Sequence, residues 1–160
     1  LYRQYYLSPI GRLCLVASDQ ALYGFVGGAK HFSVRNQGRG ASRHLKSILK
    51  DQELLEAYLK VIIQVQIPSL ADRGNNLSAK GLAALRDIPV GEAELIVRLG
   101  KVILCQSAQA VGTAVGKNPW LILVPCHRVL PSSGHIGKYV AGEDAKRFLL
   151  HLEGIRFDNP

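Results

Sequence analysis

The chain lacks several features that mark whole classes of protein. Its 160 residues contain no methionine and only three cysteines, Cys14, Cys105 and Cys126, with no Cys-X-X-Cys pair. Disulfide frameworks and zinc ribbons need paired cysteines, so we expect neither, and we expect a reducing intracellular setting. No apolar run approaches the ~18 residues that suggest a membrane span. We therefore expect no membrane partner and a cytoplasmic location, or a nuclear one if the source is eukaryotic.

The first residues, Leu1 to Gln4, do not resemble a signal peptide. The absence of an initiator methionine suggests a trimmed or engineered chain. Acidic residues are also missing from one long stretch. Between residues 95 and 142 there is no Asp or Glu, and all the Lys and Arg side chains there are positively charged. The whole chain carries a formal net charge of +8. Such a surplus by itself favours an anionic partner only modestly, but its concentration in one half of the chain is more informative.

Turn signals and apolar periodicity divide the chain into two parts. Short apolar runs separated by turn residues predict an antiparallel meander, helical spacing predicts one helix, and a β-branched run predicts a further strand. These elements are expected at 2–7, 13–17 and 21–26 for the meander, 42–60 for the helix and 61–67 for the last strand, with a loop at 32–41. We predict an α/β (α+β) fold with an N-terminal sheet-plus-helix domain at 1–67, a linker at 68–76 and a mostly helical domain at 77–160.

The second domain is expected to contain four helices, at 77–86, 92–99, 107–117 and 143–153. The pair at 92–99 and 107–117 is compatible with a helix-turn-helix, which places its second helix in a DNA groove. Short helix pairs are also ordinary packing units, so this signal is weak alone.

The most informative stretch is the apolar run Leu121–Val124, which ends at Pro125 and is followed by Cys126, His127 and Arg128. The run predicts a buried strand that the proline terminates. A lone buried cysteine is usually a small core residue, but His and Arg are poor choices for an apolar core. This context favours a reactive thiol.

A thiol becomes a nucleophile only as a thiolate, so Cys126 needs a base nearby. Neighbouring side chains of a strand point to opposite faces, so a bridging water could relay the proton from Cys126 to His127. The base needs an orienting acid, for which Glu143, Asp144 and Glu153 are the candidates. We favour Glu153, although a solvated carboxylate at a helix end fits the pattern equally well.

A series of motifs follows in order along the chain and resembles the 6-O-methylguanine-DNA methyltransferases, DNA-repair proteins that each act once. The motifs are Asn118-Pro119, Val124-Pro125-Cys126-His127-Arg128-Val129, Ser133-Gly134, Gly137-Lys138-Tyr139, Lys146-Arg147-Phe148-Leu149-Leu150 and Glu153-Gly154. Residues 8–11, 84–92 and 110–112 resemble the family's first hairpin, the entry to its helix-turn-helix and its recognition helix. The resemblance covers the whole chain and is strongest over 84–154.

The resemblance implies transfer of a methyl or alkyl group from O6-alkylated guanine in double-stranded DNA to Cys126, which inactivates the protein. It implies no cofactor, a monomer, and a target base that is flipped out of the duplex. The implied catalytic set is Cys126 as acceptor, His127 as water-mediated base, Glu153 as its orienting acid and Asn118 as a brace for the thiol. The implied substrate set is Tyr139, Val115 and the backbone near Cys126, Val129 and Val140, and the implied DNA set is Gln109, Ala110, Thr113, Lys117 and Arg128.

The chain departs from the family pattern where DNA is handled. Gln109 falls at the position of the family's intercalating arginine, and the family's Ser-Tyr pair falls on Leu95-Ile96 or one residue earlier. Leu82 replaces a tryptophan and Val140 a pocket serine. We predict weaker duplex binding or base flipping with a reactive thiol retained.

Two alternatives remain from the residues. A non-repairing module of the same fold would bind alkylated DNA without reacting, but relatives of that kind lack the acceptor cysteine. An unrelated Cys-His hydrolase would turn over many times. Some family members carry a structural zinc in the N-terminal part, yet this chain offers no Cys/His cluster for a metal, and Cys14 and Cys105 are expected in the core.

Overall fold

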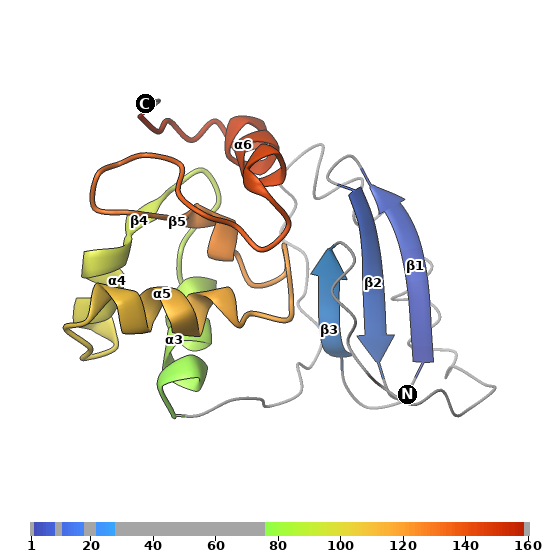
Figure 1. The fold of residues 1–160 in the computed structure, drawn as a ribbon, viewed down its shortest axis with the longest axis horizontal. Coiled ribbons are helices and arrows are strands. Elements are labelled where there is room, and N and C mark those ends of the chain that lie inside the picture. The colour runs from blue at the N-terminus through green and yellow to red at the C-terminus, as the bar shows by residue number, and fades with distance from the viewer. Residues whose placement is uncertain (1, 9–10, 18–21, 28–75, 159–160) are drawn as a thin grey trace.

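The computed structural model describes residues 2–8, 11–17, 22–27 and 76–158 (Figure 1). The first three segments are strands β1 (Tyr2–Ser8), β2 (Gly11–Ala17) and β3 (Leu22–Gly27). They form an antiparallel sheet in the order β1-β2-β3, with Cys14 of β2 opposite Tyr5 and Val26. The predicted meander is therefore confirmed. The loop, helix and strand predicted between 28 and 67, and the linker up to residue 75, lie outside the described residues.

The C-terminal part contains the helices α3 (Asn76–Arg86), α4 (Ile96–Val102), α5 (Ala108–Gly116) and α6 (Glu143–Leu152). A 3-10 helix, η1 (Cys126–Arg128), leads into strand β5 (Val129–Leu130), which pairs in parallel with β4 (Glu94–Leu95). The mixed α/β fold class is confirmed, as are the predicted helices that correspond to α3, α5 and α6. Residue 76, the last of the predicted linker, already belongs to α3.

The helix predicted at 92–99 is wrong at its start. Glu94 and Leu95 pair with Val129 and Leu130, so the backbone stays extended, and α4 begins only at Ile96. The Glu94 carboxylate also accepts a hydrogen bond from the backbone N–H of Leu95 at 2.9 Å. A short parallel pairing between segments far apart in the sequence therefore overrides the local helical pattern.

A tight turn joins α4 to α5. The backbone N–H of Cys105 donates to the carbonyl of Gly100 at 2.8 Å. A Cβ at Gly100 would lie 2.6 Å from the carbonyl oxygen of Cys105, so only glycine allows this approach. Ser107 caps α5, because its hydroxyl accepts a hydrogen bond from the N–H of Ala110 at 3.2 Å. The predicted pair of short helices with a brief turn is present.

The core of the C-terminal part lies between α3, α4 and α5, where α5 packs against both other helices (Figure 1). Leu85, Leu99 and Val111 are buried there, and the chain following α5 adds Leu121 and Val124. A smaller cluster under α6 consists of Leu130, Ile136, Leu150 and Ile155. Cys105 packs against the first cluster, and Cys14 in the sheet is half-buried. None of the described helices is long and apolar enough to cross a membrane.

The buried strand predicted at 121–124 does not form. The segment is buried as predicted, but it folds as consecutive turns with Ile122 at φ +72°. The side chain of Asn118 supplies the hydrogen bonds that a neighbouring strand would supply. Its Nδ2 donates to the carbonyl of Val124 at 2.8 Å, and its Oδ1 accepts from the N–H of Trp120 at 2.9 Å. Cys126 and His127 therefore lie on a 3-10 turn, where successive side chains still point in different directions.

Candidate active site

The thiol of Cys126 lies at the wall of a cavity of about 550 Å³, and the residue is only 7% exposed. Nδ2 of Asn118 donates a hydrogen bond to Sγ at 3.1 Å. Burial raises the pKa of the Cys126 thiol, although the Asn118 hydrogen bond and the positive charge of Lys146 oppose this rise. The resting thiol is therefore protonated at neutral pH, and it needs a base before it can attack.

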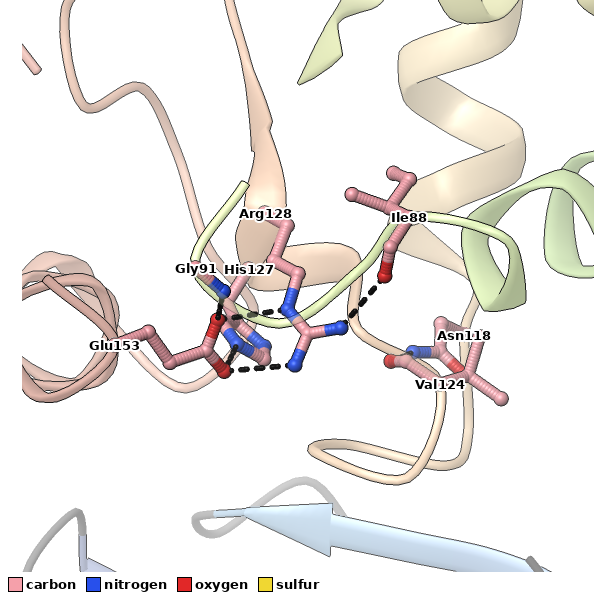
Figure 2. A network of polar contacts seen from close by, with 7 residues as sticks. All are labelled: Ile88, Gly91, Asn118, Val124, His127, Arg128 and Glu153. Atoms are coloured by element: carbon pink, nitrogen blue, oxygen red, sulfur yellow. Dashed lines mark hydrogen bonds and ion pairs between the residues drawn. The ribbon is translucent and has the colours of Figure 1, made fainter. Parts of the chain in front are cut away.

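The imidazole of His127 is completely buried and bonded on one side only. Its Nε2 lies 2.8 Å from Oε1 of Glu153, while Nδ1 has no hydrogen-bond partner among the described residues (Figure 2). Burial lowers the pKa of His127, and the hydrogen bond and charge of Glu153 oppose that effect. An ionised carboxylate can only accept, so Nε2 carries the proton. The lone pair is then on Nδ1, the nitrogen available as a base.

Glu153 is buried, so it is not the solvated carboxylate at a helix end that its sequence pattern also allowed. It follows directly after α6, and Gly154 at φ +70° ends the helix there. Its carboxylate accepts hydrogen bonds from Arg128 Nε at 2.7 Å and Arg128 Nη2 at 2.9 Å, in addition to His127. Burial alone would raise the pKa of this carboxyl, but the hydrogen bonds from His127 and Arg128, with their charges, lower it to about 2. Glu153 is therefore ionised at neutral pH.

Arg128 is buried, whereas a DNA-binding residue, as the sequence led us to expect, would lie at the surface. It is only 4% exposed, and besides Glu153 its Nη1 donates to the carbonyl of Ile88 at 2.7 Å (Figure 2). The reason is the 3-10 turn, which directs this side chain inward toward α6 and the turn after α3. The prediction of Arg128 as a DNA-binding residue is wrong.

The cavity beside Cys126 brings together the residues predicted to bind the substrate, namely Tyr139, Val115, Val129 and Val140. Its volume is in the range of pockets that hold small organic ligands. The walls come from α5, from the η1–β5 segment and from the loop before α6. Further lining residues are Ile96, Gln109, Gly112, Thr113, Gly116, Asn118, Leu130, Pro131, Lys138 and Lys146.

Lys146 is a cavity residue that the sequence reasoning placed in a motif but assigned no role. It is 2% exposed, and its Nζ donates to the carbonyl of Val129 at 2.7 Å. Burial lowers its pKa to about 8, against the opposing attraction of Cys126. A signal was present in the sequence, because Lys146 precedes the apolar Leu149 and Leu150 by three and four residues and so lies on the buried face of α6.

The residues predicted to bind DNA, other than Arg128, lie together on α5 or directly after it. Gln109, Ala110, Thr113 and Lys117 line a second hollow, together with Leu77 and Ser78 of α3. Gln109 also lines the cavity of Cys126, so it lies at the boundary between the helix surface and the cavity. The hydroxyl of Thr113 donates to the carbonyl of Gln109 at 2.9 Å within the helix. Of the Leu95-Ile96 pair, Ile96 is the cavity-lining residue.

Comparison with known proteins gives consistent results. The family model described as "6-O-methylguanine DNA methyltransferase, DNA binding domain" matches residues 76–155. A methylated-DNA–protein-cysteine methyltransferase of Methanosarcina acetivorans is 32% identical over 96% of this chain and 99% of the relative. One of Haemophilus influenzae is 34% identical over 98% of this chain and 88% of the relative.

Solved structures agree with the sequence comparisons. The crystal structure of Mycobacterium tuberculosis OGT in complex with DNA is similar with a TM-score of 0.82, at 30% identity over 96% of this chain and 92% of that one. The M. tuberculosis O6-methylguanine methyltransferase has a TM-score of 0.80 at 31% identity, over 95% of this chain and 92% of the other. From the matched model and the nearly full-length relatives, we conclude that the chain belongs to the 6-O-methylguanine DNA methyltransferase family.

Proposed function

We propose that this protein repairs DNA by moving the alkyl group of an O6-alkylated guanine onto Sγ of Cys126, once per molecule. The observation that carries this proposal is the buried thiol, bonded to Asn118 in the cavity wall, next in the chain to a buried His127–Glu153 pair with an unoccupied imidazole nitrogen. A hydrolytic Cys-His enzyme is disfavoured, because both relatives compared above are named as methyltransferases.

The reaction begins with the thiol proton. A bridging water passes it from Sγ of Cys126 to Nδ1 of His127, and the ionised Glu153 stabilises the imidazolium that results. The hydrogen bond from Asn118 stabilises the thiolate at the same time, because donors favour the charged form of an acceptor. This pair of effects supplies a nucleophile from a thiol that burial keeps protonated at rest.

The thiolate then attacks the alkyl carbon of the bound base. The S–C bond forms as the C–O6 bond breaks, and the bonding electrons stay on the guanine oxygen. Tyr139, whose buried hydroxyl lines the cavity, donates a proton to the leaving guanine. The balance is an alkyl group moved from O6 to sulfur and the thiol proton returned, through solvent, to guanine. The thioether product does not give up its alkyl group, because a thiolate is a poor leaving group, so the protein reacts once.

DNA is presented along α5. A base inside the duplex cannot reach the buried thiol, so the target nucleotide must leave the stack to enter the cavity. Gln109 lines both that cavity and the neighbouring hollow along α5, which suits a residue that contacts the gap left behind. The relatives compared above come from an archaeon and a bacterium, and we propose that the chain acts in the cytoplasm, where such cells keep their DNA.

The test is one incubation with a DNA duplex that contains a single O6-methylguanine, followed by intact mass measurement and peptide mapping. We expect one methyl group per molecule, on Cys126, and none on the Cys126→Ser variant. Methylation of Cys14 or Cys105 instead, or release of many products per molecule, would overturn the proposal. DNA binding without any mass change would favour a non-repairing module that only recognises the lesion.

A further inference from the structure

Arg128 is a buried cation beside the reacting residues, and its charge is satisfied entirely inside the protein. Its side chain is 5% exposed and that of its partner Glu153 is 3% exposed. An ion pair at this depth costs free energy for desolvation, and removing either partner leaves an unpaired buried charge. Such a pair is weak evidence for a contribution to stability, so its position next to His127 calls for another explanation.

Two nitrogens of Arg128 each donate a hydrogen bond to a different oxygen of the Glu153 carboxylate. Nε donates to Oε2 at 2.7 Å and Nη2 donates to Oε1 at 2.9 Å, which is a two-point contact between the guanidinium and the carboxylate (Figure 2). Oε1 is therefore shared between Arg128 and Nε2 of His127, which lies 2.8 Å away. The guanidinium fixes the orientation of the same oxygen that holds the imidazole.

The remaining guanidinium nitrogen, Nη1, bonds to a different part of the chain. Nη1 donates to the carbonyl of Ile88, and the N–H of Gly91 in the same turn reaches Oε2 of Glu153 at 3.5 Å. Lysine could not make these contacts together, because its ammonium lacks the planar fork that arginine provides. The arrangement holds the carboxylate from two sides.

We propose that Arg128 is a positioning residue of the alkyl-transfer reaction. Its guanidinium keeps the Glu153 carboxylate ionised and oriented, so that His127 is bonded through Nε2–H and stays neutral, with Nδ1 free to accept the thiol proton. This inference rests on the proposed roles of Cys126 and His127.

The electrostatics agree with this role. The charged groups that act on His127 are Glu153, Arg128 and Lys146, and Cys126 is its neighbour in the chain. Burial lowers the pKa of His127, Glu153 opposes this, and Arg128 and Lys146 lower it further. Without Arg128 the carboxylate would act on His127 alone, and the imidazole would hold its proton to higher pH. A protonated imidazole cannot act as a base.

The experiment compares the Arg128→Gln and Arg128→Lys variants of the full chain with the parent. The single-turnover rate constant of methyl transfer is measured from acidic to alkaline pH, with protein in excess over a methylated duplex. A separate end-point measurement with the methylated duplex in excess counts the active molecules, because each takes up one methyl group. A merely structural defect lowers that count and leaves the rate constant unchanged. Arg147→Gln is the matched control, because it removes the same charge from a half-exposed arginine that pairs with Glu143.

We expect Arg128→Gln to shift the fall of the rate constant on the acidic side of the pH profile, its acidic limb, to higher pH, because His127 keeps its proton to higher pH. Arg128→Lys should restore the limb but not the plateau rate, which should stay about 10- to 100-fold below the parent, the loss expected for one charge-assisted hydrogen bond. Arg147→Gln should match the parent. Parental limbs and plateaus in both Arg128 variants would overturn the inference.

A second measurement needs neither DNA nor activity. ¹⁵N NMR of the His127 ring reports which nitrogen carries the proton and at what pH the ring titrates. We expect protonation at higher pH in Arg128→Gln than in the parent, and an unchanged titration would contradict us. If Arg128→Gln does not fold, the plateau rate of Arg128→Lys decides, and a plateau rate equal to that of the parent refutes the proposal. A parent that takes up no methyl group would instead refute the proposed function.

Discussion

The exchange of Asn118 for aspartate perturbs the activation of the thiol with little change in shape. An aspartate retains the oxygen that accepts the N–H of Trp120 at 2.9 Å. It loses the amide that donates to Sγ of Cys126 at 3.1 Å and to the carbonyl of Val124 at 2.8 Å. The variant also places a carboxyl group beside the sulfur, where a negative charge disfavours the thiolate.

The size of the effect follows from these contacts. A hydrogen bond to a charged group contributes about 1.5–3 kcal/mol, so its loss should slow methyl transfer by about 10- to 150-fold. Repulsion between the thiolate and the carboxylate that this exchange introduces would slow it further, so this range is a lower limit. The carbonyl of Val124 loses the hydrogen bond from Asn118 but still accepts one from the N–H of Cys126 at 2.8 Å. The free energy of unfolding should therefore fall by about 0.5–1.5 kcal/mol, the net contribution of one hydrogen bond.

The assay is a single-turnover experiment with protein in excess over a duplex containing one O6-methylguanine. Thermal unfolding of the same samples shows the folded fraction, and the end point of methyl uptake from excess duplex shows the active fraction. Asn118→Ala is the comparison variant, because it also removes the oxygen that accepts from the N–H of Trp120 and should be less stable than Asn118→Asp. A parental rate constant in folded Asn118→Asp would refute the assigned role of Asn118.

Further predictions concern the thiol, the helix surface, the turn and the base. Cys126→Ser should bind the methylated duplex with parental affinity by fluorescence anisotropy and show no methyl gain by mass spectrometry. Gln109→Arg should increase the repair rate on duplex DNA, measured by gel assay of the methylated strand, and leave the rate on the free methylated base unchanged. Gly100→Ala should lower the free energy of unfolding in denaturant titrations by about 1–3 kcal/mol through overpacking, since a Cβ there meets the carbonyl of Cys105. Gly116→Ala, with nothing within 4 Å of the added Cβ, should not. The rate of methyl transfer by the parent should fall only below pH 6.5, because burial lowers the pKa of His127 from that value.

Each of these expectations has an outcome that contradicts it. Methyl uptake by Cys126→Ser would show a different acceptor. An unchanged duplex rate in Gln109→Arg would show that the missing charge does not limit delivery of the base. Equal losses of stability in Gly100→Ala and Gly116→Ala would show that the α4–α5 turn has room for a side chain. An acidic limb above pH 6.5 would mean that His127 is not the group that titrates.

The helices and the reactive motif could be predicted from the sequence because their signals are local. The apolar spacing of α3 and α6, and the serine that caps α5, all lie within or next to the elements they define. The Cys126-His127 pair was also apparent, because polar residues of this kind rarely follow a buried run without a chemical reason. Four of the five predicted DNA-binding residues lie together on α5 or directly after it.

The errors share one physical origin, which is contact between segments that are far apart in the sequence. Arg128 bonds to Glu153 and to Ile88, which are 25 and 40 residues away, and nothing near Arg128 indicates either partner. The apolar run before Cys126 was read as a strand because burial alone was visible. The hydrogen bonds that keep it in turns come from Asn118, whose amide could not be assigned from periodicity. The late start of α4 likewise depends on pairing with β5.

The distance along the chain between His127 and Glu153 has a consequence for biosynthesis. The acid that orients the base lies 26 residues after it, beyond α6. At about 5–20 residues per second, a ribosome makes the thiol and the imidazole roughly 1–5 s before the carboxylate that completes the relay. During that interval the nascent chain carries a cysteine with no oriented base, and an unperturbed thiol is mostly protonated at neutral pH. A protein that can react only once thus acquires its reactivity only after α6 and Glu153 have been made and have docked against His127.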